Sequence, residues 1–274
     1  GAPVAWTPGK TAVFAAGGDT AGPYTVTVDG TQDIGGLIFK DGSAAMAPGT
    51  DGKLRMTANS IMDVAPGLTA TIATEIAEDA PGRQLVKTGG GALVLSGANT
   101  YTGMTSVRAG ALVLGKQTAL NGDLANVTPA NVTAESGSAL GVALGDSGAG
   151  YFDDAAIDAV LSQMGPSTAT TGMKVGAQIG LDTTNVVGGT YTRSGVIGDL
   201  SGGNSIGLAK LGEGTLVLDA ANTYSGVTAI YAGILQAAAG QADAFGSARS
   251  IAFSAGSAGR LQLNGNSTTI YALS

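Results

Sequence analysis

The chain has 274 residues, of which 46 are glycine, 44% are hydrophobic and only 12% are charged. This composition excludes a disordered chain and predicts a packed core with many tight turns. The formal net charge of −7 and the lack of a Lys or Arg cluster argue against a nucleic-acid partner. Because the chain has no cysteine or histidine, it can form no disulfide and offers a metal only oxygen ligands.

Short strands are predicted in the first 40 residues, at 13–14, 24–29 and 36–40, where apolar and polar residues alternate between turn-forming Gly and Pro. Trp6 is predicted to cover the exposed end of the core. The Gly-Lys-Thr sequence at 9–11 resembles the end of a phosphate-binding loop. That loop needs a glycine where Val4 stands, so a phosphate site is excluded here.

Further strands are predicted between residues 41 and 83, at 54–57, 60–64 and 68–76, by the same alternation. Three acidic residues, Glu75, Glu78 and Asp79, lie close together before Pro-Gly at 81–82. They could bind a cation or act as an acid pair. A solvated turn is the preferred interpretation.

Residues 85–114 and 208–237 are two copies of one sequence that align without a gap. Both contain Lys-x-Gly-x-Gly-x-Leu-Val-Leu, then Ala-Asn-Thr-Tyr-x-Gly-x-Thr, then Ala-Gly-x-Leu. Self-similarity of this kind predicts a solenoid, a stack of similar coils. Leu93 and Leu112 are 19 residues apart, as are Leu216 and Leu235, so 19 residues are predicted to form one coil whose strands pair in parallel with the next.

Within each copy, several residues are predicted to shape the coil. The alternation shifts by one position at Gly110, which predicts a bend with an unusual backbone angle. Asn99 and Asn222 are predicted at corners. Tyr101 and Tyr224 are predicted to pack their rings in the core while each hydroxyl finds a partner.

Residues 146–174 break the strand pattern and predict an excursion from the coils. Acidic residues at 153–154 followed by apolar residues at 157, 160, 161 and 164 and by Gly-Pro predict one helix of about three turns. Because insertions in repeat proteins concentrate on the functional face, Tyr151, Phe152, Asp153 and Asp154 are the candidate ligand-binding residues. The alternative is that the helix only covers the core.

Strands are predicted to resume at 175–181 and 191–200 and to continue to the end of the chain. The Gly-x-Ser-x-Gly sequence at 203–207 resembles a hydrolase elbow, but the chain has no histidine to act as a base, and pairing with Lys210 lacks the strand-to-helix turn. Asp153 and Asp154 could imitate a glycan-cleaving acid pair, although their place at a helix start explains them without catalysis. We therefore expect no enzyme, cofactor or metal site.

The repeated motif resembles the autotransporter-associated, or passenger-associated, β-strand repeat of Gram-negative surface proteins. The two copies cover about a fifth of the chain. The resemblance implies a passenger domain of a monomeric, type V autotransporter, folded as an all-β, right-handed, single-stranded parallel β-helix. On this basis residues 1–274 form one β-helix passenger fragment, and a C-terminal membrane β-barrel is expected in the full-length protein but not in these residues.

This resemblance implies a place at the bacterial cell surface or outside the cell, reached through the periplasm and outer membrane. The leading functional hypothesis is an adhesin that binds a host-cell or matrix protein or a glycan, or that associates with other passengers. The alternative is a stalk that promotes folding and secretion and carries another effector region. A glycan-active enzyme is the third hypothesis.

Overall fold

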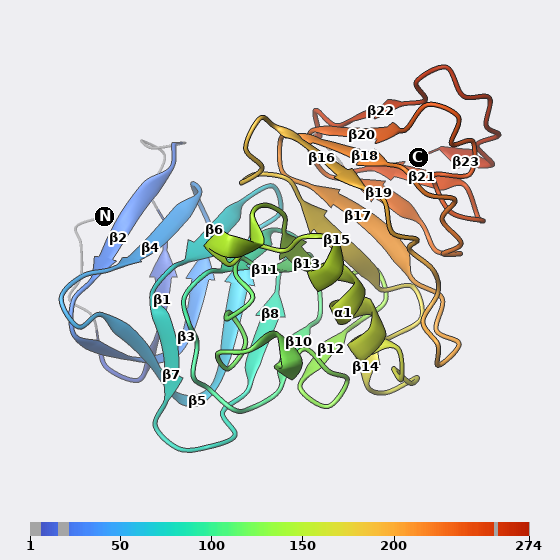
Figure 1. Cartoon of the computed structure of the whole chain (residues 1–274). Helices are drawn as coiled ribbons and strands as arrows, with labels where there is room; N and C mark the ends of the chain where they lie inside the picture. Colours follow the sequence, from blue (N-terminus) through green and yellow to red (C-terminus); the bar gives the residue numbers. More distant parts are fainter. Residues whose placement is uncertain (1–6, 16–21, 255–256, 274) are drawn as a thin grey trace. The chain divides into compact units, whose positions relative to one another are not determined.

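The computed structural model describes residues 7–15, 22–254 and 257–273, and nearly all of its regular elements are strands (Figure 1). The elements, in chain order, are β1 (Lys10–Phe14), β2 (Tyr24–Val28), β3 (Thr31–Phe39), β4 (Ala44–Pro48), β5 (Lys53–Val64), β6 (Thr69–Ile72), β7 (Glu75–Glu78), β8 (Leu85–Thr88), β9 (Ala92–Leu95), β10 (Thr105–Val107), β11 (Ala111–Leu114), η1 (Leu124–Asn126), β12 (Val132–Ala134), β13 (Ala139–Ala143), η2 (Ser147–Ala149), α1 (Asp154–Met164), β14 (Gly172–Met173), β15 (Gln178–Asp182), β16 (Thr190–Arg193), β17 (Gly207–Leu211), β18 (Thr215–Leu218), β19 (Thr228–Ile230), β20 (Ile234–Ala237), β21 (Ser250–Phe253), β22 (Arg260–Gln262) and β23 (Ala272–Leu273).

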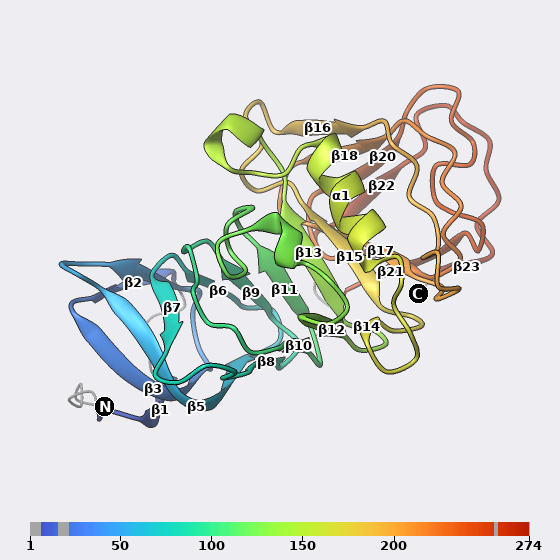
Figure 2. The same ribbon diagram turned by 60° about the horizontal axis from the view of Figure 1, so that its bottom comes forward.

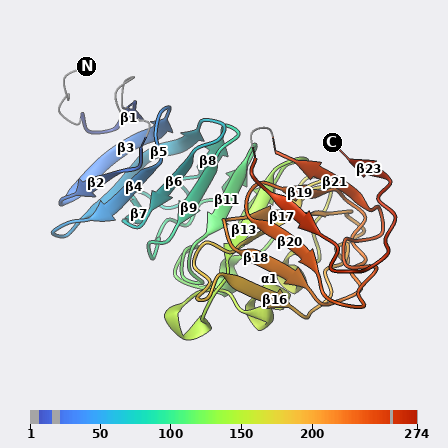
Figure 3. The same cartoon turned by 90° about the horizontal axis from the view of Figure 1, so that it is seen from above.

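The chain divides into two compact units, Gly1–Thr133 and Ala134–Ser274. In the first unit, strands alternate between two sheets as the chain advances. One sheet has the order β1-β3-β5-β8-β10, with β7 also beside β5, and the other has the order β2-β4-β6-β9-β11 (Figure 3). The strands of both sheets pair in parallel, so the first unit is a stack of coils.

The second unit has the same arrangement of strands, except that a helix interrupts it. Its larger sheet has the order β13-β15-β17-β19-β21-β23, and its smaller sheet has the order β16-β18-β20-β22 (Figure 2). From β15 onward the chain visits the two sheets in turn. Between β13 and β15, however, it forms α1 and then the short strand β14, which does not belong to the smaller sheet.

The predicted coil is confirmed in both units. Leu93 pairs in parallel with Leu112, and Leu216 pairs with Leu235. All four side chains are fully buried, because alternate residues of each strand face the core. Each copy of the repeated sequence therefore supplies two successive coils of a parallel β-helix. The prediction that all 274 residues form a single β-helix stays a prediction.

Two predicted strands are wrong in their bounds. The strand predicted at 68–76 is divided into β6 and β7, which belong to different sheets. The strand predicted at 191–200 ends with β16 at Arg193. The main-chain N–H of Ile197 donates to the side-chain oxygen of Asn222 at 2.7 Å, so this segment is held by a side chain and not by a strand partner. Trp6 lies outside the described residues. None of the helices in the described part of the chain is long and apolar enough to span a membrane.

Candidate functional site

Each copy of the repeat contains one fully buried lysine. Lys87 Nζ donates to the carbonyl oxygens of Thr88, Gly89 and Ala109 at 2.7–3.1 Å. Lys210 makes the three equivalent bonds at 2.5–3.1 Å. Burial lowers the pKa of each lysine to about 8. The lysine of the motif thus uses its three donors on its own turn and on the next coil, and it is unavailable to an external ligand.

The asparagine of the motif joins three successive coils. Asn99 accepts a hydrogen bond from the N–H of Ile76 at 2.8 Å and donates to the carbonyl of Ala119 at 2.7 Å. Asn222 makes the equivalent two bonds at 2.7 and 2.6 Å. These bonds satisfy main-chain groups that the corner removes from the ladder, so the predicted corner role is confirmed.

The tyrosine of the motif has the predicted core role. The ring of Tyr101 is buried, and its hydroxyl lies 2.8 Å from the hydroxyl of Thr105; Tyr224 and Thr228 repeat the contact at 2.6 Å. Burial raises the pKa of Tyr101 to about 12 and also raises that of Tyr224. Thr105 and Thr228, the last threonine of the motif in each copy, are therefore the hydrogen-bond partners of the two tyrosine hydroxyls.

The last glycine of the motif allows one coil to lie against the next. Gly110 and Gly233 have positive φ angles of 65° and 66°, a conformation that L side chains rarely adopt. A Cβ atom at Gly110 would lie 2.3 Å from the carbonyl oxygen of Gly91, and one at Gly233 would lie 2.4 Å from that of Gly214. The bend predicted at Gly110 is confirmed, and close approach of the neighbouring backbone is a second reason for glycine.

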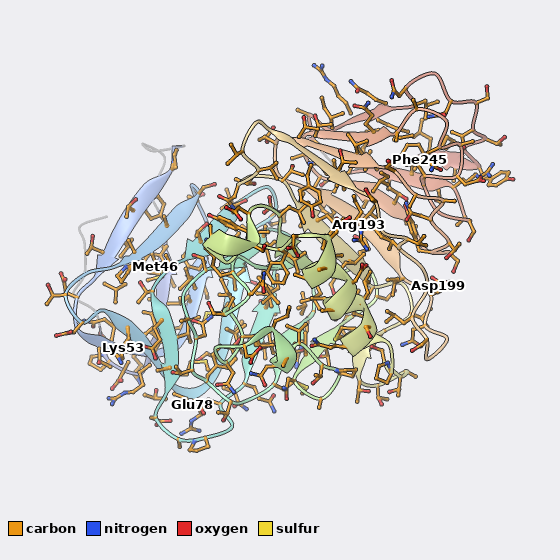
Figure 4. All side chains as sticks on the ribbon, in the orientation of Figure 1. Met46, Lys53, Glu78, Arg193, Asp199 and Phe245 are labelled. Atoms are coloured by element: carbon orange, nitrogen blue, oxygen red, sulfur yellow. The ribbon has the colours of Figure 1, made fainter. Side chains whose placement is uncertain are left out.

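A carboxylate from the preceding coil caps each copy (Figure 4). Glu78 accepts hydrogen bonds from the N–H of Arg83 at 2.9 Å and from the N–H and hydroxyl of Thr102 at 3.0 and 2.6 Å. Asp199 binds the N–H and hydroxyl of Ser225 in the same way, at 3.0 and 2.6 Å. The acidic group predicted as a solvated turn therefore includes a carboxylate that joins two coils.

Most of the predicted ligand-binding residues have structural roles within the excursion at 146–174. Phe152 is fully buried and forms a parallel bridge with Leu144, so its ring belongs to the core. Asp153 is the N-cap of α1, accepting the N–H of Ala156 at 2.9 Å, and this bond lowers the pKa of its carboxyl. Tyr151 is half-buried beside η2. The ligand-binding role of these residues stays a prediction.

The helix predicted at 153–164 is confirmed as α1, which begins at Asp154. Its N-cap is the predicted acidic residue, and its buried face consists of Ala156, Ile157, Val160 and Met164. The apolar spacing therefore serves burial of one helix face.

The fourth predicted residue, Asp154, connects α1 to the edge strand β16. Its carboxylate accepts the Tyr191 hydroxyl and the N–H of Ser194, both at 2.9 Å. Arg193, which is fully buried, donates to the carbonyl of Asp154 at 3.1 Å and pairs with the carboxylate of Asp158 (Figure 4). Burial and the nearby Asp154 carboxylate raise the pKa of Tyr191. The excursion thus covers the edge of the smaller sheet.

Arg193 was not predicted from the sequence, and neither was a groove on the larger sheet of the second unit. The sequence did contain a signal for Arg193. Arg193 lies two residues after Tyr191, so in a strand both side chains point to the same face. If that face is the core, the buried arginine needs acidic partners nearby. No comparable signal marked the groove, because its residues come from several coils.

An open groove of about 430 Å³ lies on the outer face of the larger sheet in the second unit. Ala229 is at its floor, with Val227 and Tyr231 two residues to either side on the same face. Gln178 also lines the groove and is 7% exposed. Its amide oxygen has no hydrogen-bond partner in the described part of the chain. The oxygen is itself buried, so it is the open, uncharged concave surface that makes this groove the candidate ligand site.

The parallel coils and their internally bonded motif define a repeat protein of the β-solenoid class. A family model described as the passenger-associated-transport-repeat matches residues 85–114 and 208–237, the two copies found above. The chain therefore carries repeats of autotransporter passengers, and the two matches indicate an autotransporter passenger domain. This class implies export to the cell surface or extracellular space. No curated protein and no solved structure matches the chain.

Proposed function

We propose that this passenger is an adhesin, which binds a host-cell or matrix component at the bacterial surface. The observation that carries the proposal is the open, uncharged groove of the second unit, whose lining includes Val227, Tyr231 and Gln178. A concave surface that combines apolar and polar side chains is typical of binding sites.

Catalysis has less support as a function. In the proposed acid pair, the carboxylate of Asp153 accepts a hydrogen bond from the first turn of α1. The carboxylate of Asp154 accepts hydrogen bonds from Tyr191 and Ser194. Both carboxylates therefore have structural partners, and neither is left to transfer a proton to a substrate.

A stalk that supports folding and secretion is the second candidate. It is favoured by the repeats, whose polar side chains are bonded to their own or adjacent coils (Lys87, Asn99, Tyr101, Lys210, Asn222 and Tyr224). On this view the repeats stabilise the stack and leave recognition to another region.

Binding measurements separate the two candidates. The purified chain, labelled with a fluorophore, is titrated onto host cells and onto immobilised matrix proteins and glycans. An adhesin gives saturable binding that unlabelled chain displaces. A chain that is folded by circular dichroism yet binds none of these surfaces is a stalk.

A further inference from the structure

The centre of the groove is apolar and without charge. Ala229 and Ala252 are paired in register on β19 and β21, and both line the groove. Val227 and Tyr231 also line it, two residues before and after Ala229, so the three side chains share the outer face. Among the described residues of the lining, none is Asp, Glu, Lys or Arg. A partner on this surface is therefore bound without ion pairs.

An apolar side chain protrudes elsewhere in the second unit. Val187, in the loop between β15 and β16, is 94% exposed and is the most exposed large hydrophobic residue of the described part of the chain. The loop, residues 183–189, consists of Thr, Asn, Val and Gly and carries no charge. Seating Val187 in an apolar surface would remove it from water, which favours association.

Hydrogen bonds hold the loop in one conformation. The N–H of Gly189 donates to the carbonyl of Val186 at 3.0 Å and closes a four-residue turn, the Val187 turn (residues 186–189). Gly188 has a φ of 79° at the third position, as a type II turn requires. At the start of the loop, the Asp182 carboxylate accepts two hydrogen bonds, at 2.8 and 2.6 Å. Because the turn is already ordered, little conformational freedom is lost on binding.

The Val187 turn does not occupy the groove of its own molecule. No residue of 183–189 is among the described lining residues. Gln178 lines the groove at the start of β15, whereas the loop leaves from the other end of that strand, after Asp182. The chain has a net charge of −7, so two copies repel each other least where both surfaces are uncharged. The groove and the turn satisfy this condition together.

We infer that copies of this chain associate head to tail, with the Val187 turn of one copy seated in the groove of the next. The two surfaces differ, so the contact is heterologous and each copy can bind two others. The tip of one turn is much smaller than the roughly 800 Å² that each partner of a stable complex buries, so a single contact dissociates in dilute solution. Many copies displayed on one surface would bind jointly. This inference goes beyond the proposed adhesion to a host and gives the groove a second partner.

The test is clustering of beads that are densely coated with the purified chain, measured by light scattering. Beads coated with the unaltered chain should cluster. Val187→Asp places a charge on the turn, and Ala252→Leu fills the groove, so beads coated with either variant alone should stay dispersed. Val196→Asp, at a 54% exposed valine in another loop of the unit, is the matched control and should leave clustering unchanged.

Mixtures of beads test the head-to-tail geometry. Val187→Asp keeps an open groove and Ala252→Leu keeps its turn, so beads of the two variants should cluster when mixed. Beads of Val187→Asp, labelled in a second colour, should also enter clusters of unaltered beads, a result that does not depend on the folding of Ala252→Leu. Added salt should strengthen clustering, because it screens the repulsion between chains of net charge −7.

Unaltered beads that stay dispersed, Val187→Asp beads that cluster alone or stay outside the clusters of unaltered beads, or clusters that salt disperses would each overturn the inference. Binding of the labelled chain to host cells or matrix proteins is measured separately, and Val187→Asp should retain it because its groove is open. Host binding with dispersed beads overturns the inference and leaves the proposed adhesin intact. Clustered beads without host binding support the inference and contradict the proposed host adhesin.

Discussion

At the scale of single residues, the repeat depends on buried polar groups with complete sets of partners. The asparagine and tyrosine roles could be predicted, because asparagine favours corners and tyrosine combines a ring with a hydroxyl. Lys87 could not be predicted in the same way. A lysine between apolar residues usually extends its amine to water, and only the fold brings three carbonyls around this one.

Replacing Lys87 with methionine is expected to destabilise the chain. The variant keeps most of the buried volume but leaves three carbonyls without their donor, so the free energy of unfolding should fall by about 2 kcal/mol. Urea denaturation followed by circular dichroism measures the change. Lys40→Met, at an exposed lysine of the same unit, is the control and should change little. Equal effects of the two substitutions would contradict the role of Lys87.

Stability is expected to rise and then fall in alkali. Lys87 and Lys210 have folded pKa values of about 8 against 10.5 in the unfolded chain, so between these values the unfolded chain holds more protons and stability rises with pH. Tyr101 has a folded pKa of about 12 against 10.0, so above pH 10.0 the folded chain holds more protons and stability falls.

Urea denaturation at intervals from pH 7 to pH 12 should therefore place maximum stability near pH 10. A double variant, Lys87→Met with Lys210→Met, should lose the rising limb and keep the falling one. A steady decline of stability from pH 8 in the unaltered chain is the result that opposes these assignments.

At the scale of elements, α1 lies between β13 and β14 and closes the edge of the smaller sheet. The helix could be predicted from its acidic N-cap and apolar spacing, which are local signals. Its docking on β16 could not, because Asp154 and Arg193 are 39 residues apart and meet only after the coils have formed.

Replacing Arg193 with methionine is expected to weaken the docking of α1 on β16, which the bonds from Tyr191 and Ser194 to Asp154 still hold. The variant leaves the carboxylates of Asp154 and Asp158 without their cation, and unfolding free energy should fall by about 2 kcal/mol, less than for a fully buried pair because both carboxylates are partly exposed. Thermal and urea unfolding measure the loss. Arg55→Met, which breaks an exposed ion pair with Asp33, is the control and should have a much smaller effect.

Removal of residues 146–171 should expose the main chain of β16 and cause self-association. The N–H of Ser194 loses its acceptor, Asp154, and the edge strand becomes available to a second molecule. Arg193→Thr is added so that no buried cation is left unpaired. Sedimentation velocity should show concentration-dependent dimers or larger species in the deletion and monomer in the Arg193→Thr single variant. A deletion that stays monomeric would mean that α1 does not protect the edge.

At the scale of the whole molecule, the solenoid could be predicted because two copies of one sequence impose one coil geometry. The groove could not be predicted, since it is built from residues between Ser136 and Ser254 that share no motif and meet on one face of several coils. The recognisable repeats thus build the stack, and the groove combines residues of the second repeat, such as Val227 and Tyr231, with residues outside it.

A passenger has to reach the outside of the cell, so surface exposure of this segment is the most direct test. Antibodies raised against the purified 274-residue chain are applied to intact bacteria that make the full-length protein, and to the same bacteria after permeabilisation. Labelling of intact cells, removed by external protease, is the expected result. Labelling that appears only after permeabilisation would contradict a surface passenger and, with it, the proposed adhesive function.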